Sequence, residues 1–167
     1  PTIVAKVNKA KIFLNILSFS LKIYNISSLK LKHMNDKLIE KKQNTSLGFE
    51  AQRYVLEEYG SEHIHLKNDS KELVFMIMFR TIPEDSSGVA HILEHTTLCG
   101  SENFKVRDPF FMMLRRSMST FMNAFTSSDW TAYPFATQSK KDFFNLLDVY
   151  LDAAYFPLLE EEDFKQE

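Results

Sequence analysis

The sequence predicts an α+β fold in which helices pack on a layered antiparallel sheet. Strand-like and helix-like runs follow one another in the order strand, strand, helix, helix, strand, strand, helix, without an internal repeat. Short turns link the two members of each strand pair. Hydrophobic residues make up 44% of the 167 residues and include 15 phenylalanines, so most of the chain can build a core.

The first two strands are expected over Glu62–Asn68 and Glu72–Thr81, on either side of the turn-forming run NDS. The second, ELVFMIMFRT, is almost continuously apolar, which is the pattern of a strand covered on both faces. The folded part of the chain is expected to begin near Ser46.

Two helices are expected next. Ser86 or Ser87 can cap a helix over 88–97, because a serine hydroxyl accepts a hydrogen bond from a free N–H of the first turn. A second helix is expected in DPFFMMLRRSM, with Asp108 as its N-cap and Pro109 at its first position, where proline lacks only an N–H that would be unpaired anyway.

The run STFMNAFTSSDWTAYPFAT predicts two further strands that turn at Ser127–Asp129. Ser139 and Asp142 then have the spacing of a capping box, in which each end of the pair bonds the backbone of the other. Apolar residues at helical spacing follow, and Pro157 ends this last helix.

Charge is distributed unevenly along the chain. Residues 1–35 contain six lysines and no acidic residue, and the rest contains the other 14 of 20 basic side chains with all 22 acidic ones. A negative body argues against a nucleic-acid-binding protein, which usually presents a basic face. It is compatible with binding basic or unstructured peptides. The single cysteine, Cys99, excludes an internal disulfide framework and a four-cysteine metal site.

Residues 1–45 are interpreted as a basic, targeting-like or unstructured extension. An organellar presequence and a secretory apolar region both fit this segment, and an ordinary amphipathic helix or untranslated sequence upstream of Met34 are the alternatives. Its apolar run, Ile12–Leu21, is too short and too interrupted to span a bilayer, so no membrane span is expected. Because the chain starts at Pro1 and its last run, EEEDFKQE, has no terminating pattern, we expect a fragment.

The run GVAHILEHTTLCGS places three ionisable groups on one helix face. His91, Glu94 and His95 stand at positions i, i+3 and i+4, which lie on the same side of an α-helix. Two imidazoles one turn apart can reach one Zn²⁺, and a carboxylate between them can take a proton from water whose pKa the metal lowers to roughly 7. The pattern is H-x-x-E-H, the inverse of the H-E-x-x-H motif.

These residues also have plainer interpretations. His91 and His95 could be surface histidines beside a solvated glutamate, but their apolar neighbours favour a buried helix, where unpaired ionisable groups are costly. His63 and His65 share one strand face, and a solvated face explains them better than a metal pair. Asn123 marks either an exposed edge strand, which can bind an extended peptide by backbone pairing, or an internal strand with a turn-side hydrogen bond.

Several longer motifs allow a family resemblance to be stated. GVAHILEH, LCGS, RDPF, TFMNAFT, YPF and VYLDAAYFP occur in this order within residues 46–167. Together they resemble the pitrilysin/insulinase family of zinc peptidases with the inverse motif, in its presequence protease and falcilysin branch. The resemblance implies that residues 46–167 are the incomplete N-terminal part of the first α+β metallopeptidase domain of a longer protein.

The resemblance also implies roles for individual residues. His91 and His95 match the family's zinc ligands, and Glu94 matches the base that activates the hydrolytic water. Asn123 and Ala124 match the edge strand that holds the substrate backbone. The family's third zinc ligand is a glutamate on a later helix, which is expected beyond Glu167.

The expected function is therefore that of a zinc-dependent endopeptidase for unstructured oligopeptides such as cleaved targeting peptides. Its partners would be unfolded peptides and the missing C-terminal half of the same protein, and the isolated fragment is expected to be inactive. An organelle, mitochondrion or plastid-like, is the expected location, with a secretory route as the alternative.

The alternative function is a non-catalytic structural or peptide-binding subunit of the same fold, against which the intact H-x-x-E-H set argues. A truncated chain that binds a partner through an exposed half-domain surface is a third possibility.

Overall fold

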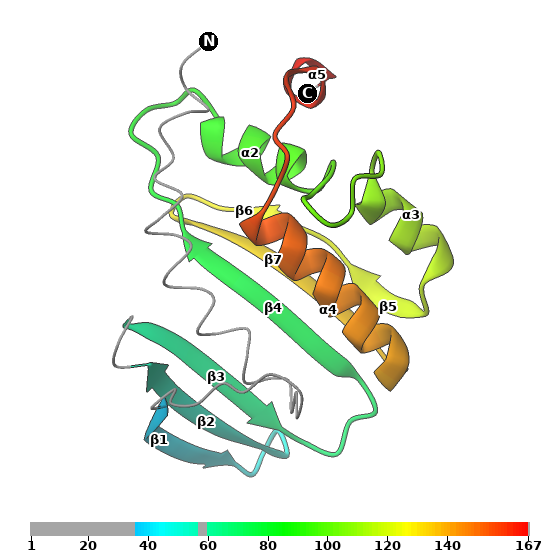
Figure 1. Ribbon diagram of the computed structural model, residues 1–167. Coiled ribbons are helices and arrows are strands. Elements are labelled where there is room, and N and C mark those ends of the chain that lie inside the picture. The colour runs from blue at the N-terminus through cyan, green and yellow to red at the C-terminus, as the bar shows by residue number, and fades with distance from the viewer. Residues whose placement is uncertain (1–35, 57–59, 167) are drawn as a thin grey trace. The chain divides into compact units, whose positions relative to one another are not determined.

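The computed structural model describes residues 36–56 and 60–166, which divide into two compact units between Ser70 and Lys71 (Figure 1). Each unit contains its own antiparallel sheet, and the helices among the described residues belong to the second unit. The α+β class with layered antiparallel sheets and helices is therefore confirmed. None of the helices within the described residues is long and apolar enough to cross a membrane.

The first unit is a three-stranded meander of β1 (Asp36–Asn44), β2 (Phe49–Leu56) and β3 (Ser61–Lys67), in the order β1-β2-β3. Its first turn is closed by the Asn44 side chain, whose Oδ1 accepts from Leu47 N at 3.0 Å. Gly48 completes that turn with φ 67°, a backbone conformation that favours glycine.

The first described strand lies before Ser46, where the folded part of the chain was expected to begin. The described strands begin at Asp36, so the expected boundary falls in the turn between β1 and β2. The sequence of β1, DKLIEKKQN, is mostly polar and shows no strand-like alternation. It is a strand because its backbone pairs with β2, and an ion pair of 2.7 Å between Lys41 and Glu50 adds a cross-strand contact. Of the targeting-like extension expected over residues 1–45, residues 1–35 lie outside the described part of the chain.

The second unit is built on a sheet whose central strand is β7 (Trp130–Thr137). On one side β7 pairs with β4 (Leu73–Arg80), from Leu73 opposite Thr137 to Arg80 opposite Trp130. On its other side it pairs with two short pieces, β5 (Ser119–Met122) and β6 (Phe125–Thr126). All these pairings are antiparallel, and the turn predicted at Ser127–Asp129 joins β6 to β7.

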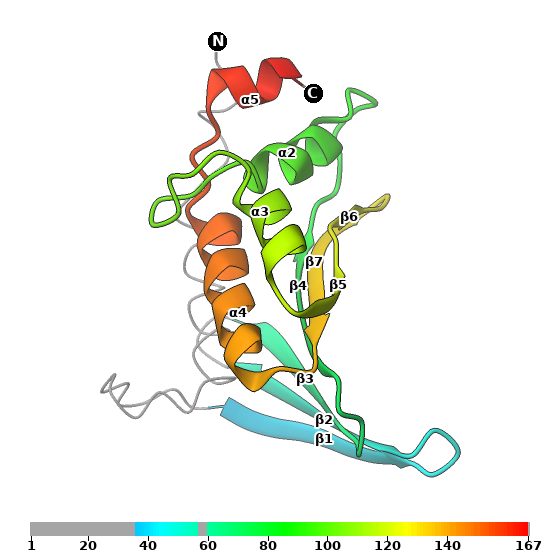
Figure 2. The same cartoon turned by 90° about the vertical axis from the view of Figure 1, so that its right-hand side faces the viewer.

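Four described helices follow and interrupt these strands: α2 (Val89–Thr97), α3 (Pro109–Arg116), α4 (Lys140–Tyr155) and α5 (Glu161–Gln166). Helices α3 and α4 lie on the same side of the sheet (Figure 2). The core forms where α4 meets that face. There the ring of Phe135 lies 5.4 Å from that of Phe75, 5.3 Å from Phe143 and 5.1 Å from Tyr150.

The other face of β4 is not covered within this unit. Val74, Met76 and Met78 are 66%, 47% and 52% exposed, whereas Phe75 and Ile77 on the helix side are buried. The prediction that β4 is covered on both faces is therefore wrong for the described residues. A continuous apolar run shows that both faces are apolar, and it does not show that both are buried.

The residue at the N-cap position agrees with the prediction for two of the three helices, α3 and α4, and differs for α2. Gly88, with φ 73°, is the N-cap of α2, and Ser87 instead bonds the carboxylate of Asp85. Asp108 occupies the N-cap position of α3, with Pro109 at the first position as predicted, but its side chain makes no capping bond. At α4 the cap is confirmed, because Ser139 Oγ accepts from Asp142 N at 3.3 Å.

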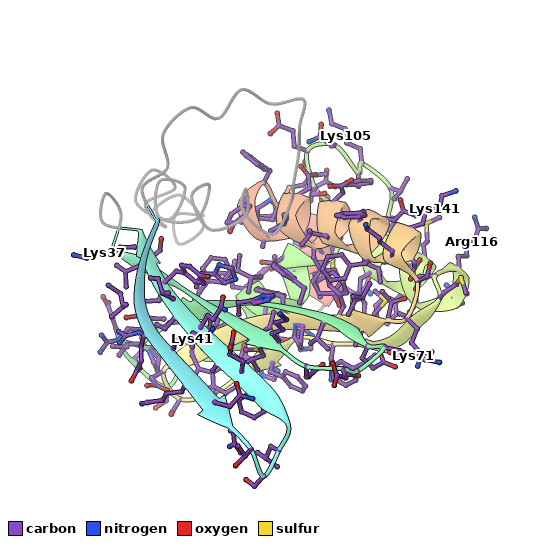
Figure 3. All side chains as sticks on the ribbon, turned by 90° about the horizontal axis from the view of Figure 1, so that it is seen from below. Lys37, Lys41, Lys71, Lys105, Arg116 and Lys141 are labelled. Atoms are coloured by element: carbon purple, nitrogen blue, oxygen red, sulfur yellow. The ribbon has the colours of Figure 1, made fainter. Side chains whose placement is uncertain are left out.

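The cationic side chains of the second unit lie on separate parts of the chain. Figure 3 shows Lys71 before β4, Lys105 between α2 and α3, Arg116 at the end of α3 and Lys141 at the start of α4, all directed outward. This distribution is that of a solvated surface.

Candidate metal and active site

The two histidines of the motif converge at the exposed face of α2. His91 Nε2 lies 3.2 Å from His95 Nε2, and the two rings are nearly perpendicular, with centroids 4.7 Å apart. Both side chains are exposed. The helical spacing of four residues thus brings two imidazole nitrogens together at the surface, as the sequence predicted.

The separation of these two nitrogens can be compared with that of two imidazole ligands on one zinc ion. Two Zn–N bonds of about 2.0–2.1 Å at a tetrahedral angle place their nitrogens about 3.3–3.4 Å apart. The observed 3.2 Å separation of the Nε2 atoms is close to that distance. His91 and His95 can therefore bind one ion together with little rearrangement.

Glu94 is buried on the inner side of the same helix, with 6% of its surface exposed. Its Oε2 accepts a hydrogen bond of 2.6 Å from Thr126 Oγ1 on β6. Thr126 Oγ1 in turn lies 3.4 Å from Thr131 Oγ1 on β7. A buried carboxylate is costly unless it is hydrogen-bonded, so the Thr126 hydroxyl compensates the burial of Glu94 and fixes its orientation.

The burial of α2 differs from the sequence prediction. The apolar flanks predicted a largely buried helix, but only Glu94, Thr96 and Thr97 of α2 are buried, and both histidines face solvent. The argument from burial cost therefore applies to Glu94 and not to His91 or His95.

Tyr133 is a further polar group beside Glu94 that the sequence did not single out. Burial raises the pKa of its phenol to about 12; a hydrogen bond with Thr97 lowers this pKa, and the nearby Glu94 carboxylate raises it. The phenol of Tyr133 therefore stays neutral at ordinary pH and is a polar group close to Thr97 and Glu94 of α2. Its position follows from strand register, which the local sequence does not reveal.

Asn123 and Ala124 lie at the break between β5 and β6, on the side of β7 away from β4. Both pieces pair only with β7 in the described part of the sheet, so this segment is an edge there. Asn123 is exposed, and its Oδ1 accepts from Ala124 N at 2.9 Å. The bond between Thr126 and Glu94 places this edge next to α2.

The described residues contain no group of three or more His, Cys, Asp or Glu side chains arranged around a common metal position. Glu160, Glu161 and Glu162, at and before the start of α5, are exposed. His63 and His65 share a face of β3, as predicted, and the ring of His63 stacks on that of Tyr54, with centroids 5.6 Å apart. This stacking accounts for His63 without a metal.

Comparison with known proteins gives one family match. The family model described as Insulinase (Peptidase family M16) matches residues 80–167, which is more than half of the chain and includes the whole of α2 and the edge segment.

Curated relatives include mitochondrial presequence proteases from fungi and vertebrates. The protein from Emericella nidulans is 58% identical over 128 residues, which are 77% of this chain and 12% of the relative. Those from Danio rerio and Mus musculus are 62% and 60% identical over 108 residues, or 65% of this chain and 11% and 10% of the relatives. The chain thus spans about a tenth of the length of the curated relatives that it matches.

Among solved structures, the crystal structure of pitrilysin resembles the chain with a TM-score of 0.61. The match covers 78% of this chain and 14% of that of pitrilysin, at 20% sequence identity. At 20% sequence identity, this structural similarity supports a shared fold and nothing more specific.

Proposed function

Because the chain belongs to the insulinase family of peptidases, peptidase family M16, we propose that it is the N-terminal part of a zinc-dependent endopeptidase that degrades unstructured oligopeptides. The observation that carries the proposal is the pair of imidazole nitrogens 3.2 Å apart on the helix that also holds the buried Glu94. The third ligand would come from a glutamate beyond Glu167, and a C-terminal half of the same protein would close the site.

The chain's own residues would divide the chemistry between them. His91 and His95 would hold the ion, which supplies Lewis acidity when bound. Glu94 would accept the proton that the attacking water loses and return it to the leaving amine. Thr126 would hold the Glu94 carboxylate in place for that transfer, through the bond of 2.6 Å.

The substrate would lie along the edge that contains Asn123 and Ala124. An extended peptide can add to such an edge by main-chain hydrogen bonds, which give affinity without requiring a particular sequence. This mode suits cleaved targeting peptides, the substrate class that the relatives' name, presequence protease, indicates. The same names, which include the word mitochondrial, support a mitochondrial location for this protein.

The test requires the longer protein that contains this chain, because the proposed third ligand lies outside it. Purified protein would be assayed for zinc content and for cleavage of an unstructured, presequence-like peptide. Glu94→Gln should retain zinc and lose about 10²- to 10⁴-fold in turnover, the range attributed to a general base. His91→Ala should lose both zinc and activity.

Glu84→Gln is the matched control, because Glu84 is an exposed glutamate in the loop before α2 and should leave turnover unchanged. A wild-type protein that binds the peptide and zinc without cleaving it would exclude the peptidase. That result would favour the non-catalytic, peptide-binding subunit.

A further inference from the structure

A proline occupies the middle of the central strand β7, where a backbone donor is normally needed. Pro134 faces Met76 on β4 and Asn123 on the other side. Asn123 N donates to Pro134 O at 3.2 Å, which shows that the hydrogen-bonding groups of Pro134 point toward the edge. In an antiparallel pair of this type the two residues exchange two bonds, and proline cannot donate the second. The Asn123 carbonyl therefore loses its strand partner.

The missing donor is replaced by a side chain from helix α4. Tyr150 donates its hydroxyl to Asn123 O over 3.3 Å. Its ring packs in the core against Phe135, and the residue is only 1% exposed. Burial raises the pKa of this phenol, so the hydroxyl keeps its proton and stays a donor.

The direction of the backbone N–H and C=O groups at Asn123 and Ala124 determines which of them point toward β7 and which point away from the sheet edge. In the common register, Phe121 lies opposite Ala136 and Phe125 opposite Ala132, so Asn123 faces Pro134 and its backbone groups point inward. The backbone groups of the next residue, Ala124, therefore point away from β7, because alternate residues of a strand pair on opposite sides. The Asn123 side chain bonds Ala124 N at 2.9 Å, which agrees with that direction.

We propose that Tyr150 is a positioning residue for the peptide-binding edge: its hydroxyl supplies the donor that Pro134 lacks and so keeps Asn123 paired opposite Pro134, between β5 and β6. A peptide could pair with Ala124 only if Asn123 and Ala124 are held in place between β5 and β6. The inference rests on the proposed function, because it assigns the same edge to the substrate.

The test is a double-mutant cycle in the longer protein, with Tyr150→Phe and Pro134→Ala. Phenylalanine keeps the buried ring and removes only the hydroxyl. Alanine at 134 restores a backbone N–H directed at Asn123 O. Tyr150→Phe alone should speed hydrogen exchange of the Asn123 amide about 3- to 10-fold, the effect of losing one hydrogen bond. It should raise KM for a long peptide by a similar factor, with a smaller change in kcat.

In the Pro134→Ala background the same substitution should have little effect on exchange or KM, because the backbone then supplies the donor. Tyr155→Phe is the control: it removes a phenol hydroxyl from the same helix at a ring that packs on Phe79 and Phe156. It should leave both measurements unchanged.

Equal effects of Tyr150→Phe in both backgrounds would overturn the proposal and leave Tyr150 as a packing residue. No effect in either background would overturn it as well. Hydrogen exchange is measured without substrate, so it tests the role of Tyr150 even if the wild-type protein has no peptidase activity. That lack of activity would contradict the proposed function alone.

Discussion

Glu94 is a buried carboxylate that a hydrogen bond from another element holds in place. Its carboxylate has little exposed surface and accepts from Thr126, which stands 32 residues later on the edge strand. Two elements that are distant in sequence are thus joined at the proposed base. The orientation of Glu94 depends on β6 as much as on its own helix.

Thr126→Val should therefore lower turnover of the longer protein by about 10- to 100-fold, because valine has the shape of threonine without its hydroxyl. Zinc content should be unchanged, since the hydroxyl of Thr126 bonds Glu94, the proposed base, and Thr131. Thr126→Ser retains the hydroxyl and should retain most of the activity. A Val variant as active as wild type would show that the bond does not matter for the reaction.

Tyr133 gives a prediction at alkaline pH. Its pKa rises from 10.0 to about 12 in the folded chain, mainly through burial. Because the folded pKa lies above the unfolded one, its stabilising effect is complete below pH 10 and is lost as pH rises through about 12. A shift of this size corresponds to roughly 3 kcal/mol.

The measurement is the ultraviolet absorbance of phenolate, followed together with denaturant unfolding over that pH range. Tyr133→Phe should remove one late-titrating phenol and make the loss of unfolding free energy with pH less steep. An unchanged pH profile in this variant would contradict the assignment. Burial raises the pKa of Tyr150 and Tyr155 too, so part of the alkaline loss should remain.

The site residues divide into those that helical periodicity reveals and those that it does not. His91, Glu94 and His95 follow from spacing within one helix, which local sequence determines. Thr126 bonds Glu94 and Tyr150 bonds Asn123, and the two residues of each pair are 27 or more positions apart in the sequence. These contacts depend on strand register and on packing between elements, so no local pattern identifies them. For Tyr150, the sequence did contain one indication. Pro134 lies inside a strand pattern, and a proline there lacks a backbone donor that another group has to supply.

At the scale of elements, the first turn of α4 connects the start of β5 to the end of β7. Asp142 Oδ2 accepts from Met118 N, just before β5, and from Thr137 Oγ1 at the end of β7, each at 3.1 Å. The capping-box prediction is thus half confirmed. Ser139 caps the helix, whereas the Asp142 carboxylate bonds the strands and leaves Ser139 N to Thr137 Oγ1.

Asp142→Ala should lower the free energy of unfolding by about 2–3 kcal/mol, because it leaves a backbone donor and a buried hydroxyl without their acceptor. Denaturant unfolding of the 167-residue chain measures this. Asp148→Ala is the control on the same helix. Asp148 is exposed and its pKa is raised by desolvation, so alanine there should be neutral or stabilising. Equal losses in the two variants would show that the Asp142 contacts contribute nothing.

The order of elements from β3 to α4 was predictable because hydrophobic periodicity and turn residues determine it locally. The missed features have a common cause. The polar strand β1, the left-handed Gly88 cap and the break between β5 and β6 depend on pairing partners or backbone conformation. None of these changes the local hydrophobic pattern.

At the scale of the whole molecule, the second unit exposes apolar side chains on more than one of its surfaces. Phe111 and Leu114 of α3 are 55% and 48% exposed, in addition to the bare face of β4. Isolated exposed residues are ordinary, but contiguous apolar faces usually contact another surface. A chain that spans about a tenth of its relatives' length would leave such faces for the rest of a longer protein.

The proposed metal site gives the last prediction. The chain supplies two imidazoles, whereas a catalytic zinc site uses three protein ligands, and loss of even outer-sphere support costs 10- to 100-fold in affinity. The 167-residue chain should therefore bind zinc at least about 100-fold more weakly than the longer protein, as measured by competition with a chelator. His91→Ala and His95→Ala should each abolish the residual binding, because one imidazole cannot hold the ion alone. Equal affinity of the two proteins would show that the ligand set is complete within the chain, and the proposed ligand beyond Glu167 would have to be abandoned.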